Sequence, residues 1–266
     1  MRILFFGMNG PFTRAVLGQL LENGWRPEAV LLSDREESGL RRLAPEASPS
    51  TNPLEVPLLD AYVEPGPLHL AWSQGIPVYA CGPLTGPPVQ AFVEAAAADV
   101  ACVACFDRKF PQAILDAPRL GVLNVHPSRL PAYRGPEPLF WQLRDDVNPM
   151  GVTVHWMDAG LDTGDLAAQG WITRPDGASW SQLESLAAQA GGDLLAQVLN
   201  ALAQGQLPRV PQPAGGSYHP LPAPADFTLS PDWTARRAFN FMRGAAAWGF
   251  PFRLEIGGQR LQLRAA

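Results

Sequence analysis

The chain has 266 residues, 47% of them hydrophobic, and a formal net charge of -5. This length allows one large domain, or one domain with a small appendage, around a sizeable core. No apolar run approaches the roughly 18 residues of a membrane span, and the first residues lack the features of a signal peptide. We therefore expect a cytoplasmic protein with no membrane partner. The negative net charge does not favour DNA as a partner.

The cysteine content does not predict a disulfide framework, because the three cysteines are few and odd in number. Cys102 and Cys105 lie in an apolar run that is typical of a buried strand. No group of His, Cys or acidic residues has the spacing of metal ligands. We therefore expect no metal site.

The first part of the chain has the pattern of a Rossmann-type βαβ unit. Residues 2–7 are predicted to form a buried strand, 12–22 an amphipathic helix and 28–32 a second strand. The turn after the first strand lacks a G-x-G-x-x-G pattern, so a dinucleotide is not expected, but Asn9 is a candidate for holding a substrate or an anion at the helix N-terminus. Residues 33–67 show no periodicity and are predicted to form a long loop.

The same alternation of strand and helix continues beyond this loop. Residues 76–80 and 99–105 are predicted strands, and 87–97 is a predicted helix. Together these elements predict an α/β fold with a mixed sheet of Rossmann type.

The most informative stretch begins with a short strand that ends at Pro127. Asn124 and His126 stand two residues apart on this strand, so their side chains share one face. Both groups lie at its carboxyl end, which is where open α/β sheets bind their ligands.

A second polar loop follows thirty-six residues later, between predicted strands at 150–157 and 166–172. If both strands join the sheet of His126, then Asp162 in this loop can face the imidazole. An amide donor, an imidazole and a carboxylate suit acyl transfer to an amine, because they can stabilise an oxyanion and move a proton near neutral pH. No nucleophilic Ser or Cys is required.

The C-terminal part contains predicted helices and one hairpin. Helices are predicted at 137–145, at 179–202 with a capping box from Ser179 to Gln182, and at 230–243. The Gly-Gly turn within 253–263 predicts a hairpin, which is marginal by itself and should pack on the preceding part of the chain or on a second copy of the chain.

Residues 205–266 carry seven Arg against three acidic side chains, which gives +4 and leaves -9 for the rest of the chain. This basic excess is a weak indication of RNA or phosphate contact. A solvated helix face explains it about as well.

The run Asn124-x-His126-Pro127-Ser128 and the loop around Asp162 together resemble the signature of the folate-dependent formyltransferases. The amino-acid sequence of residues 130–135 and 157–165 is most similar to that of the methionyl-tRNA branch. The resemblance implies transfer of a formyl group from 10-formyltetrahydrofolate to a primary amine, with Asn124, His126 and Asp162 as the catalytic residues.

The resemblance also implies two sets of binding residues. Contacts with the folate are predicted for Phe106, Asp107, Arg108, Lys109, Met157, Asp158 and Gly160. Contacts with the acceptor are predicted for Asn9, Ser128, Tyr133, Arg134 and Gly135. The turn at 107–109 departs from the family, which carries mostly small or apolar residues there, so its charged side chains put the shape of the folate site in question.

The predicted domains are a catalytic domain at 1–204, a proline-rich linker at 205–228 and a C-terminal extension at 229–266. The extension matches only the start of the barrel-like domain that helps the methionyl-tRNA enzymes to bind tRNA, so we expect a truncated version.

Four hypotheses for the function remain open from the sequence. The acceptor is the initiator methionyl-tRNA or a small amine such as an amino-sugar nucleotide. Alternatively, the same three residues hydrolyse 10-formyltetrahydrofolate with water, or the chain is a non-catalytic relative that binds a folate or a nucleotide.

Overall fold

The computed structural model describes residues 1–44 and 66–263. The chain divides into two compact units, Met1–Leu123 and Asn124–Ala266, which are described separately. Most of the loop predicted at 33–67 lies outside the described residues.

The first unit is a mostly parallel sheet with the strand order β3-β4-β2-β1-β5. Its strands are β1 (Ile3–Gly7), β2 (Ala29–Ser33), β3 (Leu40–Leu43), β4 (Val78–Cys81) and β5 (Val100–Ala104). All residues of β1 and β5 are buried, as expected for strands that are covered on both faces.

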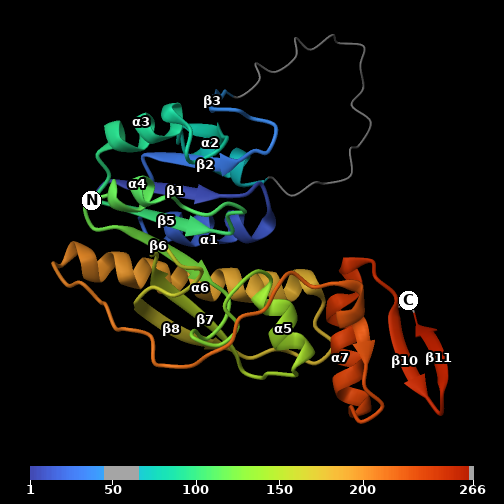
Figure 1. Cartoon of the computed structure of the whole chain (residues 1–266). Helices are drawn as coiled ribbons and strands as arrows, with labels where there is room; N and C mark the ends of the chain where they lie inside the picture. Colours follow the sequence, from blue (N-terminus) through green and yellow to red (C-terminus); the bar gives the residue numbers. More distant parts are fainter. Residues whose placement is uncertain (45–65, 264–266) are drawn as a thin grey trace, which may run out of the picture. The chain divides into compact units, whose positions relative to one another are not determined.

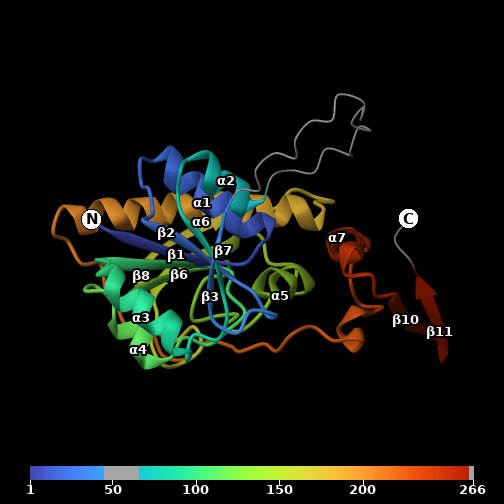
Figure 2. The ribbon, with the colours of Figure 1, turned by 90° about the horizontal axis from the view of Figure 1, so that it is seen from above.

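Among the described residues of this unit, the sheet is covered by the helices α1 (Pro11–Glu22), α2 (Pro67–Ser73), α3 (Pro87–Ala96) and α4 (Gln112–Asp116). Figure 2 shows α1 and α2 on one face of the strands and α3 and α4 on the other. This arrangement confirms the predicted α/β class and the βαβ opening.

The prediction of a structureless loop from residue 33 is wrong for β3, which pairs antiparallel with β4 at the edge of the sheet. The sequence Leu-Arg-Arg-Leu of this strand has no alternation of apolar and polar residues, which is the usual signal of a strand. Its first and last side chains are half-buried and the two arginines between them are exposed. The short helices α2 and α4 were also not predicted.

The second unit contains the strand order β6-β7-β8. Its strands are β6 (Val122–His126), which begins in the first unit, β7 (Met150–Trp156) and β8 (Leu166–Ile172). The long helix α6 (Trp180–Ala203) packs against β7 and β8, and Ser179 forms the predicted capping box with Gln182. Gly191 of α6 lies against Val125 and Val152, so the residues that alternate with these valines face away from α6.

The C-terminal elements pack around aromatic side chains. These elements are α5 (Pro138–Arg144), η1 (Pro224–Phe227), β9 (Thr228–Leu229), α7 (Ala235–Ala245), η2 (Ala246–Trp248), β10 (Phe252–Ile256) and β11 (Gln259–Leu263). Phe140 of α5 contacts the rings of Phe227, Phe241 and Trp248. Helix α7 therefore docks against α5, as Figure 1 shows, and begins at Ala235 because Thr234 caps it.

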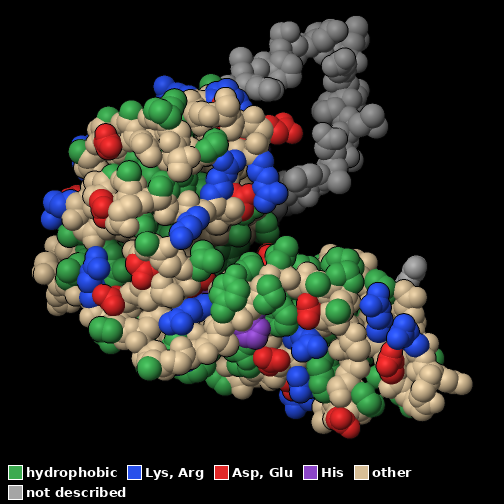
Figure 3. Space-filling model, viewed as in Figure 1, with side chains coloured by type: hydrophobic (Ala, Val, Ile, Leu, Met, Phe, Trp, Pro, Cys, Tyr) green, Lys and Arg blue, Asp and Glu red, His purple; other side chains and the backbone are tan. Residues whose placement is uncertain are grey.

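The predicted hairpin of β10 and β11 is confirmed, and β9 adds a third strand parallel to β10. Several arginines of this region are engaged by local partners. Arg236 pairs with Asp176, and Arg260 pairs with Glu255. Figure 3 accordingly shows basic and acidic side chains interspersed over this part of the surface.

Among the described residues, no helix has both the length and the apolar character that crossing a membrane requires.

Candidate active site

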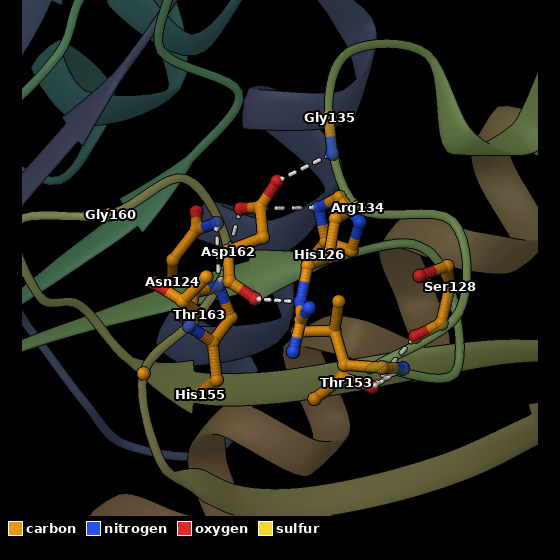
Figure 4. Close-up of polar contacts among 12 residues, drawn as sticks. Asn124, His126, Ser128, Arg134, Gly135, Thr153, His155, Gly160, Asp162 and Thr163 are labelled. Atoms are coloured by element: carbon orange, nitrogen blue, oxygen red, sulfur yellow. Dashed lines mark hydrogen bonds and ion pairs between the residues drawn. The ribbon is translucent and has the colours of Figure 1, made fainter. Parts of the chain in front are cut away.

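Asn124, His126 and His155 come from two neighbouring strands of the second unit (Figure 4). Asn124 and His126 alternate along β6 with the buried Val125, and His155 alternates with Val154 on β7. Because Val125 and Val152 face helix α6, the three polar side chains point to the opposite face. The loop between β7 and β8 adds Asp162.

The Asp162 carboxylate lies between the two imidazoles. Its Oδ1 is 3.6 Å from Nδ1 of His126 and 3.6 Å from Nε2 of His155. Its Oδ2 accepts a hydrogen bond of 2.9 Å from the backbone N–H of Gly135. Asp162 adopts the left-handed backbone region with φ 55°, which a short polar side chain tolerates better than most others.

His126 is held by a backbone carbonyl on its other side. Nε2 lies 2.9 Å from the carbonyl oxygen of Tyr133, and a carbonyl can only accept, so this nitrogen carries a hydrogen. Burial lowers the pKa of His126 below its ordinary value, against the opposing effect of Asp162. The neutral ring therefore directs the lone pair of Nδ1 towards Asp162, and a second proton there would face a carboxylate oxygen.

His155 was not predicted as a site residue, and its tautomer also follows from its neighbours. Nδ1 lies 2.9 Å from the carbonyl oxygen of Trp156, so Nδ1 carries the hydrogen and Nε2 has a lone pair. The side-chain amide of Asn124 donates to this Nε2 at 3.2 Å. One N–H of Asn124 is thereby fixed, and the second is left for another acceptor.

The Asp162 carboxylate is strongly favoured in its ionised form. Burial acts to raise the pKa of Asp162, but the attraction of the carboxylate for a proton on His126 or His155, together with the N–H of Gly135, holds that pKa well below its ordinary value. The site therefore combines a fixed negative charge, a neutral imidazole with an open lone pair and an oriented amide donor. This combination is suited to stabilising an oxyanion and accepting a proton.

The predicted acceptor residues of the second unit form the wall of this site. The Ser128 hydroxyl donates to the carbonyl of Ala132 at 2.8 Å, so it holds the turn after β6. Tyr133 supplies the carbonyl for His126, and Gly135 supplies the N–H for Asp162. The guanidinium of Arg134 is half-buried and donates to the Asp162 carbonyl.

The second unit also holds three of the predicted folate residues, in the loop after β7. Asp158 accepts from the N–H of Gly160 at 2.9 Å and from the Thr163 hydroxyl at 2.7 Å. A side chain at Gly160 would overlap Thr163. These contacts give the loop a defined shape between Met157 and Asp162.

The other predicted folate residues follow β5 in the first unit. Phe106 packs edge to face on Phe6 and Phe110. Asp107 accepts from Ser33 and from Arg35, and Arg108 donates to the Asp34 carbonyl. Asp107 and Arg108 are thus satisfied by the last residue of β2 and the two residues after it, while Lys109 is exposed.

Asn9 is an exposed residue of the turn between β1 and α1, also in the first unit. That turn is joined to the end of β5, because the Thr13 hydroxyl donates to the carbonyl of Ala104 and accepts from the N–H of Met8. Within the described residues, no three side chains of His, Cys, Asp or Glu are grouped so that they could hold a metal ion.

A family model for formyl transferases matches residues 1–199. The chain belongs to the formyl transferase family. A methionyl-tRNA formyltransferase of Synechococcus sp. is 40% identical over 196 residues, which cover 73% of this chain and 60% of the relative. One of Delftia acidovorans is 33% identical over 257 residues, which cover 94% of this chain and 75% of the relative.

A sugar N-formyltransferase from Shewanella has the same formyl transferase fold, with a TM-score of 0.62 and 17% identity. The superposition covers 100% of this chain and 97% of that structure. The fold therefore extends over the C-terminal elements as well as the region of the family match. Against the Synechococcus relative, the chain spans about 60% of the length.

Proposed function

We propose that this formyl transferase family member transfers the formyl group of 10-formyltetrahydrofolate to a primary amine. The observation that carries the proposal is the convergence of Asn124, His126 and Asp162 on one face of the second unit, in the order and spacing of the family motif. The donor supplies the formyl carbon as an electrophile. The three side chains supply the charge stabilisation and the proton transfer that amine attack requires.

Asn124 is proposed to stabilise the oxyanion. When the amine attacks the formyl carbon, negative charge collects on the formyl oxygen, and a preorganised N–H donor lowers the energy of that state. His155 accepts one hydrogen of the Asn124 amide, so the direction of the second is fixed before the substrate arrives. His155 therefore acts as a positioning residue through Asn124.

His126 and Asp162 are proposed to move the proton. The attacking nitrogen becomes positively charged and must lose a proton before the intermediate collapses. Nδ1 of the neutral His126 can accept it, because the resulting imidazolium would present its two N–H groups to the Tyr133 carbonyl and the Asp162 carboxylate. The proton then passes to the nitrogen that leaves, so the charges balance at the end of the reaction.

For the acceptor, we propose methionyl-tRNA as the first candidate. The support is the amino-acid sequence of residues 157–165, together with the relatives at 33–40% identity that are named methionyl-tRNA formyltransferase. An amino-sugar nucleotide and water are outcomes that the experiment distinguishes. The Shewanella sugar enzyme, at 17% identity, supports the fold and not the choice of acceptor.

Several expectations stay predictions under this proposal. These are the folate contacts of Phe106, Asp107, Arg108, Lys109, Met157, Asp158 and Gly160, and the acceptor contacts of Asn9, Ser128, Tyr133, Arg134 and Gly135. The division at residues 204 and 228, the association of two copies through the C-terminal extension and the cytoplasmic location also remain to be tested.

The proposal is tested by incubating the protein with 10-formyltetrahydrofolate and one acceptor at a time. Tetrahydrofolate is followed by absorbance, and the acceptor by mass spectrometry. A formylated methionyl-tRNA supports the proposal in full. A formylated amino sugar corrects the acceptor, formate released without any acceptor makes the protein a hydrolase, and no turnover refutes the activity.

A further inference from the structure

The proline-rich segment 208–221, which we call the strap, follows helix α6 and packs on the candidate active site of the same unit. Its first residues are fixed by β8, because Val210 and Leu166 exchange two backbone hydrogen bonds of 2.8 and 2.9 Å. Just before them, the indole N–H of Trp156 donates to the Pro208 carbonyl. The start of the strap is therefore anchored beside the loop that carries Asp162.

The end of the strap is anchored on the turn after β6. The backbone N–H of Arg134 donates to the Ser217 carbonyl, and the backbone carbonyl of Arg134 accepts from the N–H of His219. The Ser217 hydroxyl accepts from the backbone N–H of Tyr133. The His219 ring stacks on Tyr133 with centroids 5.1 Å apart and packs on Trp141 at 4.8 Å. The strap is thus anchored both beside the loop that carries Asp162 and on the turn after β6.

Gln212 lies between these two anchors and uses its whole side-chain amide. Its Oε1 accepts from Nε of Arg134 at 3.2 Å and from Nη2 at 2.6 Å. Its Nε2 donates to the carbonyls of Asp162 and Gly164, each at 2.8 Å. The side chain therefore joins the two loops that meet at the Asp162 carboxylate.

We propose that Gln212 is a positioning residue for formyl transfer, which holds the Asp162 loop against the Arg134 turn and so keeps the Asp162 carboxylate beside His126. The inference rests on the proposed function of the site. Asp162 has a left-handed backbone conformation, which costs some energy even for a short polar side chain, so hydrogen bonds to its backbone help to hold it. Gln212 supplies one of them and also fixes Arg134, which supplies a second.

The test compares two variants of Gln212 with a matched control. Gln212→Met keeps the length of the side chain and removes every hydrogen bond. Gln212→Glu keeps an acceptor for Arg134 but has no N–H for the carbonyls of Asp162 and Gly164. Gln206→Met makes the same chemical change at an exposed position of the segment before the strap.

Steady-state kinetics provide the first measurement. Because small displacements of a catalytic group reduce the chemical step, kcat should fall by about tenfold to a hundredfold in both Gln212 variants. The KM values for donor and acceptor should stay near those of the wild type, since Gln212 is not proposed to contact either substrate. Gln206→Met should match the wild type, and an unchanged kcat in Gln212→Met refutes the proposal.

The second measurement does not depend on activity. The chain has four histidines, so the His126 ring can be assigned in an NMR titration of nitrogen-labelled protein by its loss in His126→Gln. Asp162 raises the pKa of His126, so a carboxylate that moves away should leave that pKa lower in Gln212→Met than in the wild type. An unchanged His126 pKa refutes positioning of Asp162 even if kcat falls.

The two measurements separate this inference from the proposed function. If the wild type transfers no formyl group to any acceptor but Gln212→Met lowers the His126 pKa, the positioning role stands and the assigned reaction fails. If the wild type is active and both Gln212 variants keep its kcat and its His126 pKa, the reaction stands and the positioning role fails.

Discussion

Asn124 donates a hydrogen bond of 3.2 Å to Nε2 of His155, on the neighbouring strand. The direction of this bond is set by Trp156. Its carbonyl accepts a hydrogen bond from Nδ1–H of His155, so Nε2 has no hydrogen and acts as an acceptor. The proposed oxyanion donor is therefore oriented by a residue that need not touch a substrate. Because both side chains stand on strands, the geometry exists before a ligand binds.

The first prediction concerns this positioning. His155→Phe keeps a buried aromatic ring but removes the acceptor for Asn124, so kcat for formyl transfer should fall on the order of a hundredfold. His155→Gln offers an amide oxygen and should retain more activity than the Phe variant. Equal activity of the wild type and His155→Phe would show that Asn124 needs no such support.

The second prediction addresses Asn124 directly. Asn124→Leu has nearly the same volume and no donor, so kcat should fall by about 10²–10³-fold, as is typical for the loss of one oxyanion donor. Binding of tetrahydrofolate, measured by calorimetry, should stay close to that of the wild type. A variant that lost binding and kept kcat at saturating donor would assign Asn124 to substrate binding instead.

Much of the fold was predictable because its strands have clear apolar runs and its turns have strong signals. The hairpin of β10 and β11 follows from two glycines between alternating residues, and the start of α6 follows from Ser179 and Gln182. Strand β3 was missed because its four residues, with two central arginines, carry no alternation and are identified only by their pairing with β4.

The candidate site was predictable in part for a different reason. Asn124, His126 and Asp162 lie in two short sequence motifs that resemble those of the formyltransferases, and their side chains come together in the second unit. His155 was missed because one histidine among buried strand residues gives no signal beyond its alternation with Val154. Gln212 was missed because its partner Asp162 is 50 residues away and the strap has no periodicity.

The third prediction concerns the dependence of stability on pH. The pKa of His126 is lowered in the folded state by burial, and the pKa of Asp162 is also lowered. Below the ordinary histidine pKa of 6.5, the unfolded chain therefore binds more protons than the folded chain. Stability that is present above that pH is lost as the pH falls below it. His126→Gln removes this histidine contribution.

The measurement is urea unfolding between pH 7.5 and about pH 5 for the wild type and His126→Gln. The free energy of unfolding of the wild type should decrease more steeply on acidification than that of the variant. Parallel curves, or a steeper loss in the variant, would contradict a lowered His126 pKa.

The fourth prediction tests how helix α6 supports the strand of the site. A methyl group at Gly191 would overlap the side chain of Val125, whose neighbours on β6 are Asn124 and His126. Gly191→Ala should therefore lower the free energy of unfolding by about 1–3 kcal/mol, as overpacked cores do, although alanine favours a helix by up to about 1 kcal/mol. The kcat should also fall, because Val125 can yield only by moving β6.

Gly18→Ala is the matched control for this change. Gly18 also lies in a helix, α1, but a methyl group there meets only Leu70, at an ordinary contact distance of 3.9 Å. This variant should gain about 0.5–1 kcal/mol from helix propensity and keep its kcat. If Gly191→Ala were stabilised to the same extent and remained fully active, the contact between α6 and Val125 would have room to relax, and the strand would not depend on a glycine at this position.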